Sequence, residues 1–107
     1  MIFSLSSLQP STIGCLSSLL ELWCDQNQLK TFPPELGQLK QLLYLDGSKN
    51  RLESLPAEID GCVALADLHL STNLLRSMPE SVGRLSNLTT LKADDNRLQA
   101  LPLSIGG

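Results

Sequence analysis

The sequence lacks any cluster of basic residues and any long apolar run. Its 8 lysines and arginines are scattered among 11 acidic residues, and the net charge is −3. Nucleic-acid-binding domains typically carry a basic patch or stripe, so we do not expect nucleic-acid binding. The apolar runs fall far short of the roughly 20 residues that span a membrane, which argues against a transmembrane segment. The apolar stretch at residues 1–8 has no positive charge and is too short for a typical signal peptide.

Cysteine is also scarce. The 3 cysteines are an odd number and lack the spacing of a metal site, so we predict no metal and no other cofactor. Buried structural thiols are the ordinary interpretation of such residues, and they suit a reducing compartment.

What the sequence does contain is a repeat of 23 residues. Three residue types mark it: asparagine at Asn27, Asn50, Asn73 and Asn96, proline at Pro33, Pro56, Pro79 and Pro102, and leucine at Leu22, Leu45, Leu68 and Leu91. Self-similarity at a fixed period predicts an array of one small unit. Such a unit cannot bury its apolar face alone and must stack on copies of itself.

The opening of each unit, Leu-x-x-Leu-x-Leu-x-x-Asn-x-Leu, matches the leucine-rich repeat signature. We therefore predict an α/β leucine-rich repeat solenoid of about four and a half 23-residue repeats. It has a parallel β-sheet on the concave face and short 3₁₀ or helical turns and loops on the convex face. Leucines at alternate positions predict a half-buried strand, with Leu45, Leu68 and Leu91 pointing into the core.

The residues beside these leucines should point outward and form the partner-binding surface on the concave face. They are Glu21, Trp23, Tyr44, Asp46, Asp67, His69, Thr90 and Lys92. Trp23 and Tyr44 stand on adjacent strands, and exposed aromatic residues are enriched at binding hot spots. The alternative role for the two rings is to cover the sheet or to pack against a missing N-terminal unit.

The repeats begin at residues 19, 42, 65 and 88, and residues 10–18 fit the second half of a preceding unit. We assign 10–107 to a single repeat domain and 1–9 to an atypical N-terminal segment, because Ser4 holds the asparagine position there and Leu8 is one place early. The array is expected to be truncated at both ends, as a fragment, a gene-model truncation or a splice form.

The recurring asparagine ends each strand, where its amide can bond turn backbone and the neighbouring unit. Asn27, Asn50, Asn73 and Asn96 are therefore predicted to form a structural ladder. Proline should open the return segment as its first helical residue. Glycine should end it in a left-handed conformation, at Gly14, Gly37, Gly83 and Gly106. Asp60 takes that position in one unit, followed by Gly61, so we expect that turn to shift by one residue.

Two further features concern the strands: a set of residues that resembles a catalytic triad, and a core position with small side chains. Asp46, His69 and Ser48 or Ser71 resemble the parts of a hydrolase triad, but an open sheet offers no oxyanion site, so we predict no catalysis. The sixth position of the unit, normally leucine, is underfilled by Gly47 and Ala93. Either neighbouring side chains fill this space or the core is locally loose.

Longer stretches of the sequence narrow the class. They are Leu22-Trp23, Asn27-Gln28-Leu29, Pro33-Pro34-Glu35-Leu36-Gly37, Leu39-Lys40-Gln41-Leu42, Tyr44-Leu45-Asp46, Ser48-Lys49-Asn50, Gly61-Cys62, Ala64-Leu65, Asp67-Leu68, Thr89-Thr90-Leu91-Lys92 and Asp94-Asp95-Asn96. They resemble the array of the LAP proteins, the family of scribble, erbin, densin and lano. The likeness runs from about Pro10 onward, and its informative residues, Trp23, Asp46 and Lys92, face outward.

The resemblance implies a non-catalytic protein–protein interaction module of a cytoplasmic scaffold. Such a scaffold organises cell polarity, cell junctions or synapses and places receptors at the inner face of the basolateral membrane, at junctions or at postsynaptic sites. Any membrane association would be peripheral, through the full-length protein. The alternative is a regulatory leucine-rich repeat adaptor in Ras or phosphatase signalling. An extracellular receptor is disfavoured, because the signal peptide and the paired capping cysteines are missing.

Overall fold

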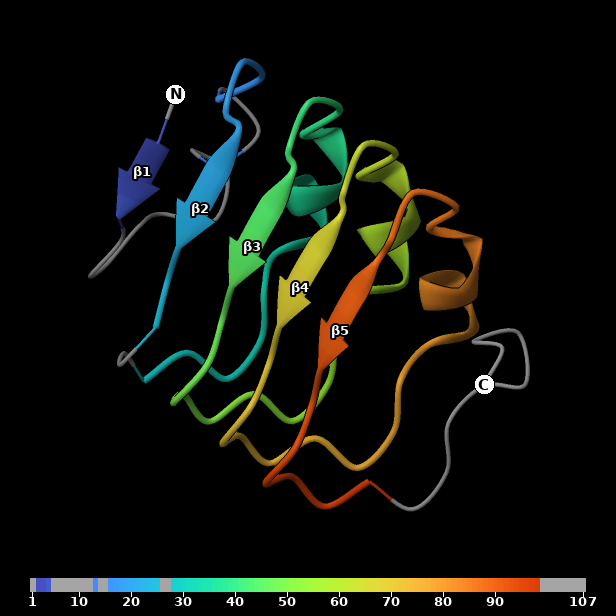
Figure 1. Ribbon diagram of the computed structural model, residues 1–107. Helices are drawn as coiled ribbons and strands as arrows, with labels where there is room; N and C mark the ends of the chain where they lie inside the picture. Colours follow the sequence, from blue (N-terminus) through green and yellow to red (C-terminus); the bar gives the residue numbers. More distant parts are fainter. Residues whose placement is uncertain (1, 5–12, 14–15, 26–27, 99–107) are drawn as a thin grey trace.

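The sheet is built from strands of three residues each. The computed structural model describes residues 2–4, 13, 16–25 and 28–98, and within them five strands form one parallel sheet in the order β1-β2-β3-β4-β5 (Figure 1). The strands are β1 Ile2–Ser4, β2 Glu21–Trp23, β3 Tyr44–Asp46, β4 Asp67–His69 and β5 Thr90–Lys92. Each strand lies beside the next one along the chain, as stacked repeats require.

The sequence period sets the register of the sheet. From β2 to β5 each residue pairs with the one 23 positions later, as Glu21 does with Tyr44. The central leucines of the strands therefore stack on one another. Leu45 and Leu68 are fully buried, and Leu91 packs against the core. The predicted inward positions are confirmed.

The first strand, β1, was not predicted from the sequence. Ile2 pairs with Glu21, which is only 19 positions later. At the 23-residue period Ser4 aligns with the asparagines, so the sequence does not predict a strand at these residues. The segment that we set apart as atypical thus adds a strand to the sheet.

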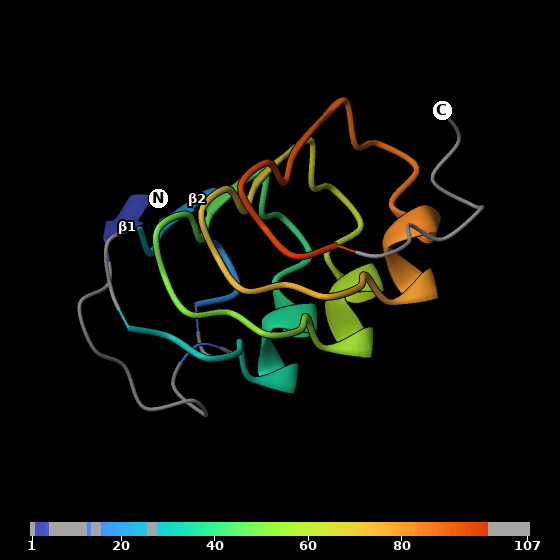
Figure 2. The same ribbon diagram turned by 90° about the horizontal axis from the view of Figure 1, so that it is seen from below.

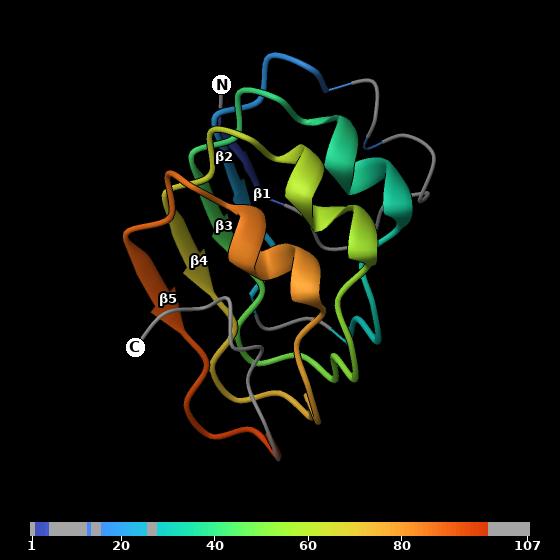
Figure 3. The ribbon, with the colours of Figure 1, turned by 90° about the vertical axis from the view of Figure 1, so that its right-hand side faces the viewer.

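The return segments contain 3₁₀ turns of five residues, as predicted. They are η2 Pro34–Gln38, η3 Ala57–Gly61 and η4 Glu80–Arg84. These turns, the teal, yellow-green and orange coils of Figure 2, lie in a row on one side of the molecule. Figure 3 shows the strands along the opposite side. The core leucines fill the space between the sheet and the turns.

The recurring proline stands just before each turn rather than as its first residue, although η2 also begins with a second proline, Pro34. Pro33, Pro56 and Pro79 have φ between −67° and −71° and extended ψ, and each is the N-cap of its turn. Their carbonyl oxygens accept the first hydrogen bond of the turn at 3.0 to 3.1 Å. The missing proline N–H costs nothing here, because an N-cap N–H has no partner inside a helical turn.

The expected left-handed glycines are not found in the described part of the chain, where no glycine has a positive φ. Glycine is needed for space instead. A Cβ on Gly37 would lie 2.3 Å from the carbonyl oxygen of Glu58, and one on Gly61 would lie 2.2 Å from that of Gly37. Successive turns therefore approach each other backbone to backbone. Gly14 and Gly106 lie outside the described residues.

The expected shift of the turn at Asp60 is also wrong. The turn η3 begins and ends 23 positions after η2, so it keeps the register of its neighbours. Because glycine does not supply a special φ at this position, aspartate can take the same backbone conformation. Asp60 instead pairs with Arg84 of η4 at 3.5 Å.

The underfilled sixth position is packed by a neighbouring side chain. A Cβ on Gly47 would lie 2.9 Å from the Phe32 ring and 3.3 Å from Leu52. Phe32 is buried and belongs to the core cluster. Of the two alternatives left open by the sequence, the structure shows the filled core at Gly47.

Candidate functional site

The outward residues of strands β2 to β5 form one surface, which we call the strand face. Its eight residues are Glu21, Trp23, Tyr44, Asp46, Asp67, His69, Thr90 and Lys92. All are half-buried except Lys92, which is exposed. Partial burial on an open sheet means that these side chains pack against one another.

Three aromatic side chains form a row across the strand face. The ring centroids of Trp23 and Tyr44 lie 4.6 Å apart at 31°, and those of Tyr44 and His69 lie 5.0 Å apart at 37°. The repeat pattern predicts the first two rings as neighbours but not His69 as the third. The contact is diagonal, because Tyr44 opens its strand whereas the other two close theirs. A list of equivalent repeat positions therefore does not show it.

Carboxylates fix the polar edges of these rings. The Trp23 indole donates to Glu21 Oε1 at 3.1 Å, and the Tyr44 hydroxyl donates to Asp46 Oδ2 at 3.4 Å. Burial raises the pKa of Tyr44 first, and the negative charge of Asp46 raises it further. The strand face thus combines apolar ring surface with a negative potential.

The residues that resemble a hydrolase triad are engaged elsewhere. Asp46 Oδ1 accepts the backbone N–H of Ser48 at 2.9 Å, and the Ser71 hydroxyl donates to Asp94. Among the described residues, His69 makes no hydrogen bond to a serine hydroxyl or to Asp46. A nucleophile needs a base within hydrogen-bond reach, and these side chains do not provide that pair.

Behind the strand face, asparagine side chains link successive units. Asn73 Oδ1 accepts the backbone N–H groups of Asn50 at 3.2 Å and Leu52 at 3.0 Å. Its Nδ2 donates to the carbonyl oxygens of Gly47 and Leu70, both at 3.0 Å. One amide therefore bonds its own unit and the preceding one.

The neighbouring asparagines make equivalent contacts. Asn50 Nδ2 donates to the Cys24 carbonyl at 2.9 Å, and its Oδ1 accepts the Leu29 N–H at 3.2 Å. Asn96 Nδ2 donates to the Leu70 carbonyl at 2.9 Å. Each of these bonds reaches the preceding unit, so Asn50, Asn73 and Asn96 link the four repeat units that begin at residues 19, 42, 65 and 88.

The residue before each of these asparagines has a left-handed backbone. Lys49, Thr72 and Asp95 have φ of 60°, 60° and 58°. This conformation is uncommon for residues with a side chain and is least favourable for β-branched threonine. It marks the sharp bend at which the chain leaves the sheet. Asn27, the remaining predicted member of the ladder, lies outside the described residues.

Solved structures similar to this chain share its architecture, although no family model and no curated protein matches the sequence. A leucine-rich repeat protein of Leptospira interrogans is 34% identical with a TM-score of 0.82, over 88% of this chain and 24% of that one. The chain folds as a leucine-rich repeat solenoid.

Two plant receptors are also similar to this solenoid. Peptide hormone receptor RGFR1, in complex with RGF2, is 34% identical with a TM-score of 0.75 over 84% of this chain and 15% of that one. The ectodomain of the Arabidopsis thaliana receptor kinase GASSHO1/SCHENGEN3, in complex with Casparian strip integrity factor 2, is 34% identical with a TM-score of 0.79 over 94% and 12%.

The solenoid spans a quarter or less of each of these three proteins. The leucine-rich repeat fold is typically a surface for binding other proteins rather than an enzyme fold. No helical turn within the described ranges is long and apolar enough to cross a membrane. Nor do His, Cys, Asp and Glu side chains gather there in groups of three or more, as metal ligands would.

The buried cysteines of the solenoid are poor nucleophiles. Burial, followed by the charges of Asp46 and Asp25, raises the pKa of Cys24 to about 12. Burial likewise raises the pKa of Cys62 to about 11, and its Sγ donates to the Leu36 carbonyl at 3.2 Å. A thiol that stays protonated at neutral pH packs as a small apolar group. The third cysteine, Cys15, lies outside the described residues.

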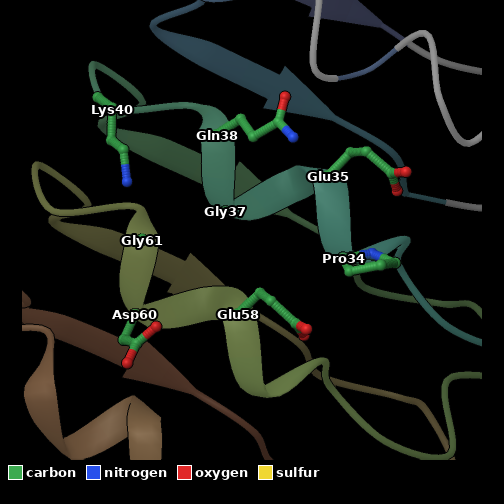
Figure 4. A pocket seen from close by; sticks show the side chains of 8 residues that line it. All are labelled: Pro34, Glu35, Gly37, Gln38, Lys40, Glu58, Asp60 and Gly61. Carbon is green, nitrogen blue, oxygen red and sulfur yellow. The ribbon is translucent and has the colours of Figure 1, made fainter.

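A shallow hollow of about 400 Å³ lies on the opposite side of the solenoid, between η2 and η3 (Figure 4). It is lined by Pro34, Glu35, Gly37, Gln38, Lys40, Glu58, Asp60 and Gly61. Gly37 and Gly61, where the two turns meet backbone to backbone, form part of its lining. It is open to solvent, and its charged groups are held at the surface, so it offers no enclosed site for chemistry.

Proposed function

We propose that the solenoid is a non-catalytic protein-binding module and that its partner docks on the strand face. The observation that carries this proposal is the row of Trp23, Tyr44 and His69, whose rings lie 4.6 and 5.0 Å apart on the side away from the helical turns. Aromatic side chains are enriched at interface hot spots, because they bury a large rigid surface at little entropic cost.

We further propose that the module belongs to a cytoplasmic scaffold of the LAP type, with a role in cell polarity, junctions or synapses. Two observations support this proposal. Trp23, Asp46 and Lys92, the informative residues in the resemblance to the LAP array, all lie on the strand face. The deeply buried thiols of Cys24 and Cys62 suit a reducing compartment.

The test is capture of partner proteins by the immobilised 107-residue chain. We expect Trp23→Ala and Asp46→Lys to weaken capture while leaving the far-UV circular dichroism spectrum unchanged. Glu58→Lys, on η3, is the matched control, because it makes the same charge reversal on the opposite side of the molecule. If both strand-face variants capture the same proteins as the wild type, the strand face is not the docking surface.

A second candidate function is ligand recognition by an extracellular receptor. It is favoured by the two plant receptor structures, which are complexes with RGF2 and with Casparian strip integrity factor 2. The location of the tagged full-length protein separates the two candidates. The scaffold proposal requires it on the cytoplasmic side of the plasma membrane, where protease added to intact cells does not reach it.

A further inference from the structure

The strand face has a checkerboard of rings and carboxylates. Strand by strand, its six members are Glu21 and Trp23, Tyr44 and Asp46, and Asp67 and His69. On each strand one residue is aromatic and the other is acidic, and the order reverses from one strand to the next. Every ring therefore faces a carboxylate on a neighbouring strand, and every carboxylate faces a ring.

These carboxylates keep room for further donors. Asp46 accepts one hydrogen bond on each oxygen, from the Ser48 N–H and the Tyr44 hydroxyl. A carboxylate oxygen has two lone pairs, so each can accept again. The Asp67 side chain accepts no hydrogen bond from any residue that the structure describes. Lys92, on β5 at the edge of the strand face, is the one lysine among its eight residues, and its ammonium has the opposite charge to the carboxylates.

We infer that the strand face binds an extended basic segment of the partner protein through its arginine side chains. Each guanidinium stacks on a ring and bonds the carboxylate beside it. This inference rests on the proposed function of the strand face. Arginine fits because its planar cation stacks on aromatic faces and donates two parallel hydrogen bonds to a carboxylate.

The spacing of the checkerboard is close to that of side chains on an extended chain, and the long arginine side chain spans the difference. Neighbouring strands lie about 4.8 Å apart and alternate residues of a strand about 6.8 Å apart, so diagonal neighbours such as Asp46 and Asp67 lie roughly 8 Å apart. In an extended peptide, side chains on one side recur about every 6.8 Å. A segment of the form Arg-x-Arg therefore brings its two side chains to successive carboxylates.

The experiment uses the single tryptophan of the chain, Trp23, as its reporter. The 107-residue chain is titrated with capped Ser-Arg-Gly-Arg-Ser and with the same peptide carrying citrulline, which has the shape of arginine without its charge. We expect saturable changes in Trp23 emission, with arginine binding at least about tenfold more tightly than citrulline. Added salt should weaken the arginine complex, because exposed charges are screened.

Charge variants locate the site. Asp46→Asn and Asp67→Asn should each weaken arginine-peptide binding at least about fivefold. Asp67→Asn is the gentler change for the fold, because the Asp67 carboxylate is not hydrogen-bonded within the described residues. Glu58→Gln removes the same charge from η3 on the other side of the molecule and should change affinity less than about twofold.

Equal binding of the arginine and citrulline peptides would overturn the inference, because charge would then play no part. Equal losses from Asp67→Asn and Glu58→Gln would also overturn it, because the effect would then come from the net charge of the chain. If the arginine peptide does not bind while Trp23→Ala still abolishes partner capture, this inference fails and the proposed function stands. If Trp23→Ala leaves capture intact as well, both fail.

Discussion

Replacing Asn73 with alanine removes a side chain that joins two repeat units. Its Oδ1 accepts the backbone N–H groups of Asn50 at 3.2 Å and Leu52 at 3.0 Å, and its Nδ2 donates to the carbonyls of Gly47 and Leu70 at 3.0 Å. Asn73 is 6% exposed, so water does not readily replace these bonds. The substitution should therefore destabilise the fold far more than its small loss of volume suggests.

The cost comes from the two backbone donors. Both carbonyls keep a partner, because Asn50 Nδ2 also donates to Gly47 and Asn96 Nδ2 to Leu70, each at 2.9 Å. The two N–H groups lose theirs, and a buried donor without a partner costs about 1–3 kcal/mol. Since backbone relaxation recovers part of this, we expect the free energy of unfolding to fall by about 3 kcal/mol.

Urea denaturation followed by circular dichroism measures this loss. Asn96 accepts one described backbone N–H, that of Leu75, so Asn96→Ala should cost about half as much. Asn87 is exposed and donates to the Val63 carbonyl at the surface, and Asn87→Ala should stay within about 0.5 kcal/mol of wild type. The reasoning is refuted if Asn73→Ala costs no more than Asn87→Ala.

Three further predictions concern strain, packing and pH. Thr72→Asn should raise the urea midpoint by the equivalent of about 0.5–1 kcal/mol, because asparagine tolerates the left-handed φ of 60° better; an unchanged midpoint contradicts this. Gly37→Ala should lower the free energy of unfolding by about 1–3 kcal/mol, because its Cβ would meet the Glu58 carbonyl; a wild-type value would show that the turns can separate freely. Burial raises the pKa of Cys62 from 9.0 to about 11, so the contribution of this thiol to stability should be constant below pH 9.0 and fall as pH rises toward 11, where the unfolded thiol ionises first. The fall should be smaller in Cys62→Ala, and an identical fall would exclude this thiol as a cause.

Features that recur at the repeat period were predictable from the sequence. A leucine at the centre of strands β2 to β5 must lie inside, because reversing it would expose the whole apolar set. The positions of Leu45 and Leu68 and the register of their strands follow from that constraint. The 3₁₀ turns were predictable as well, because the segment after Pro33 or Pro56 is too short for an α-helix.

The asparagine ladder was predictable, but several other features that depend on contacts between units were not. The sequence shows that glycine recurs at Gly37, but not whether it supplies a φ or leaves space, since that depends on where Glu58 lies. The ring of His69 joins the aromatic row only through a diagonal contact. Strand β1 was not predicted, because it pairs with β2 at an offset of 19 residues and not at the 23-residue period. That the strand face binds a partner stays a prediction, because a solvated sheet can present the same side chains.

The hydrogen bonds of the asparagines have an evolutionary consequence. Within the described residues, the side-chain hydrogen bonds of Asn50, Asn73 and Asn96 end on backbone atoms, so none specifies the chemistry of an outward side chain. Substitutions at the outward positions can therefore change which partner the surface binds while the hydrogen bonds between repeats stay intact. Duplication of one whole repeat can also lengthen such a protein, because the added repeat presents the same backbone donors and acceptors to the asparagines on either side. Inserting a single residue within a strand offers no such route.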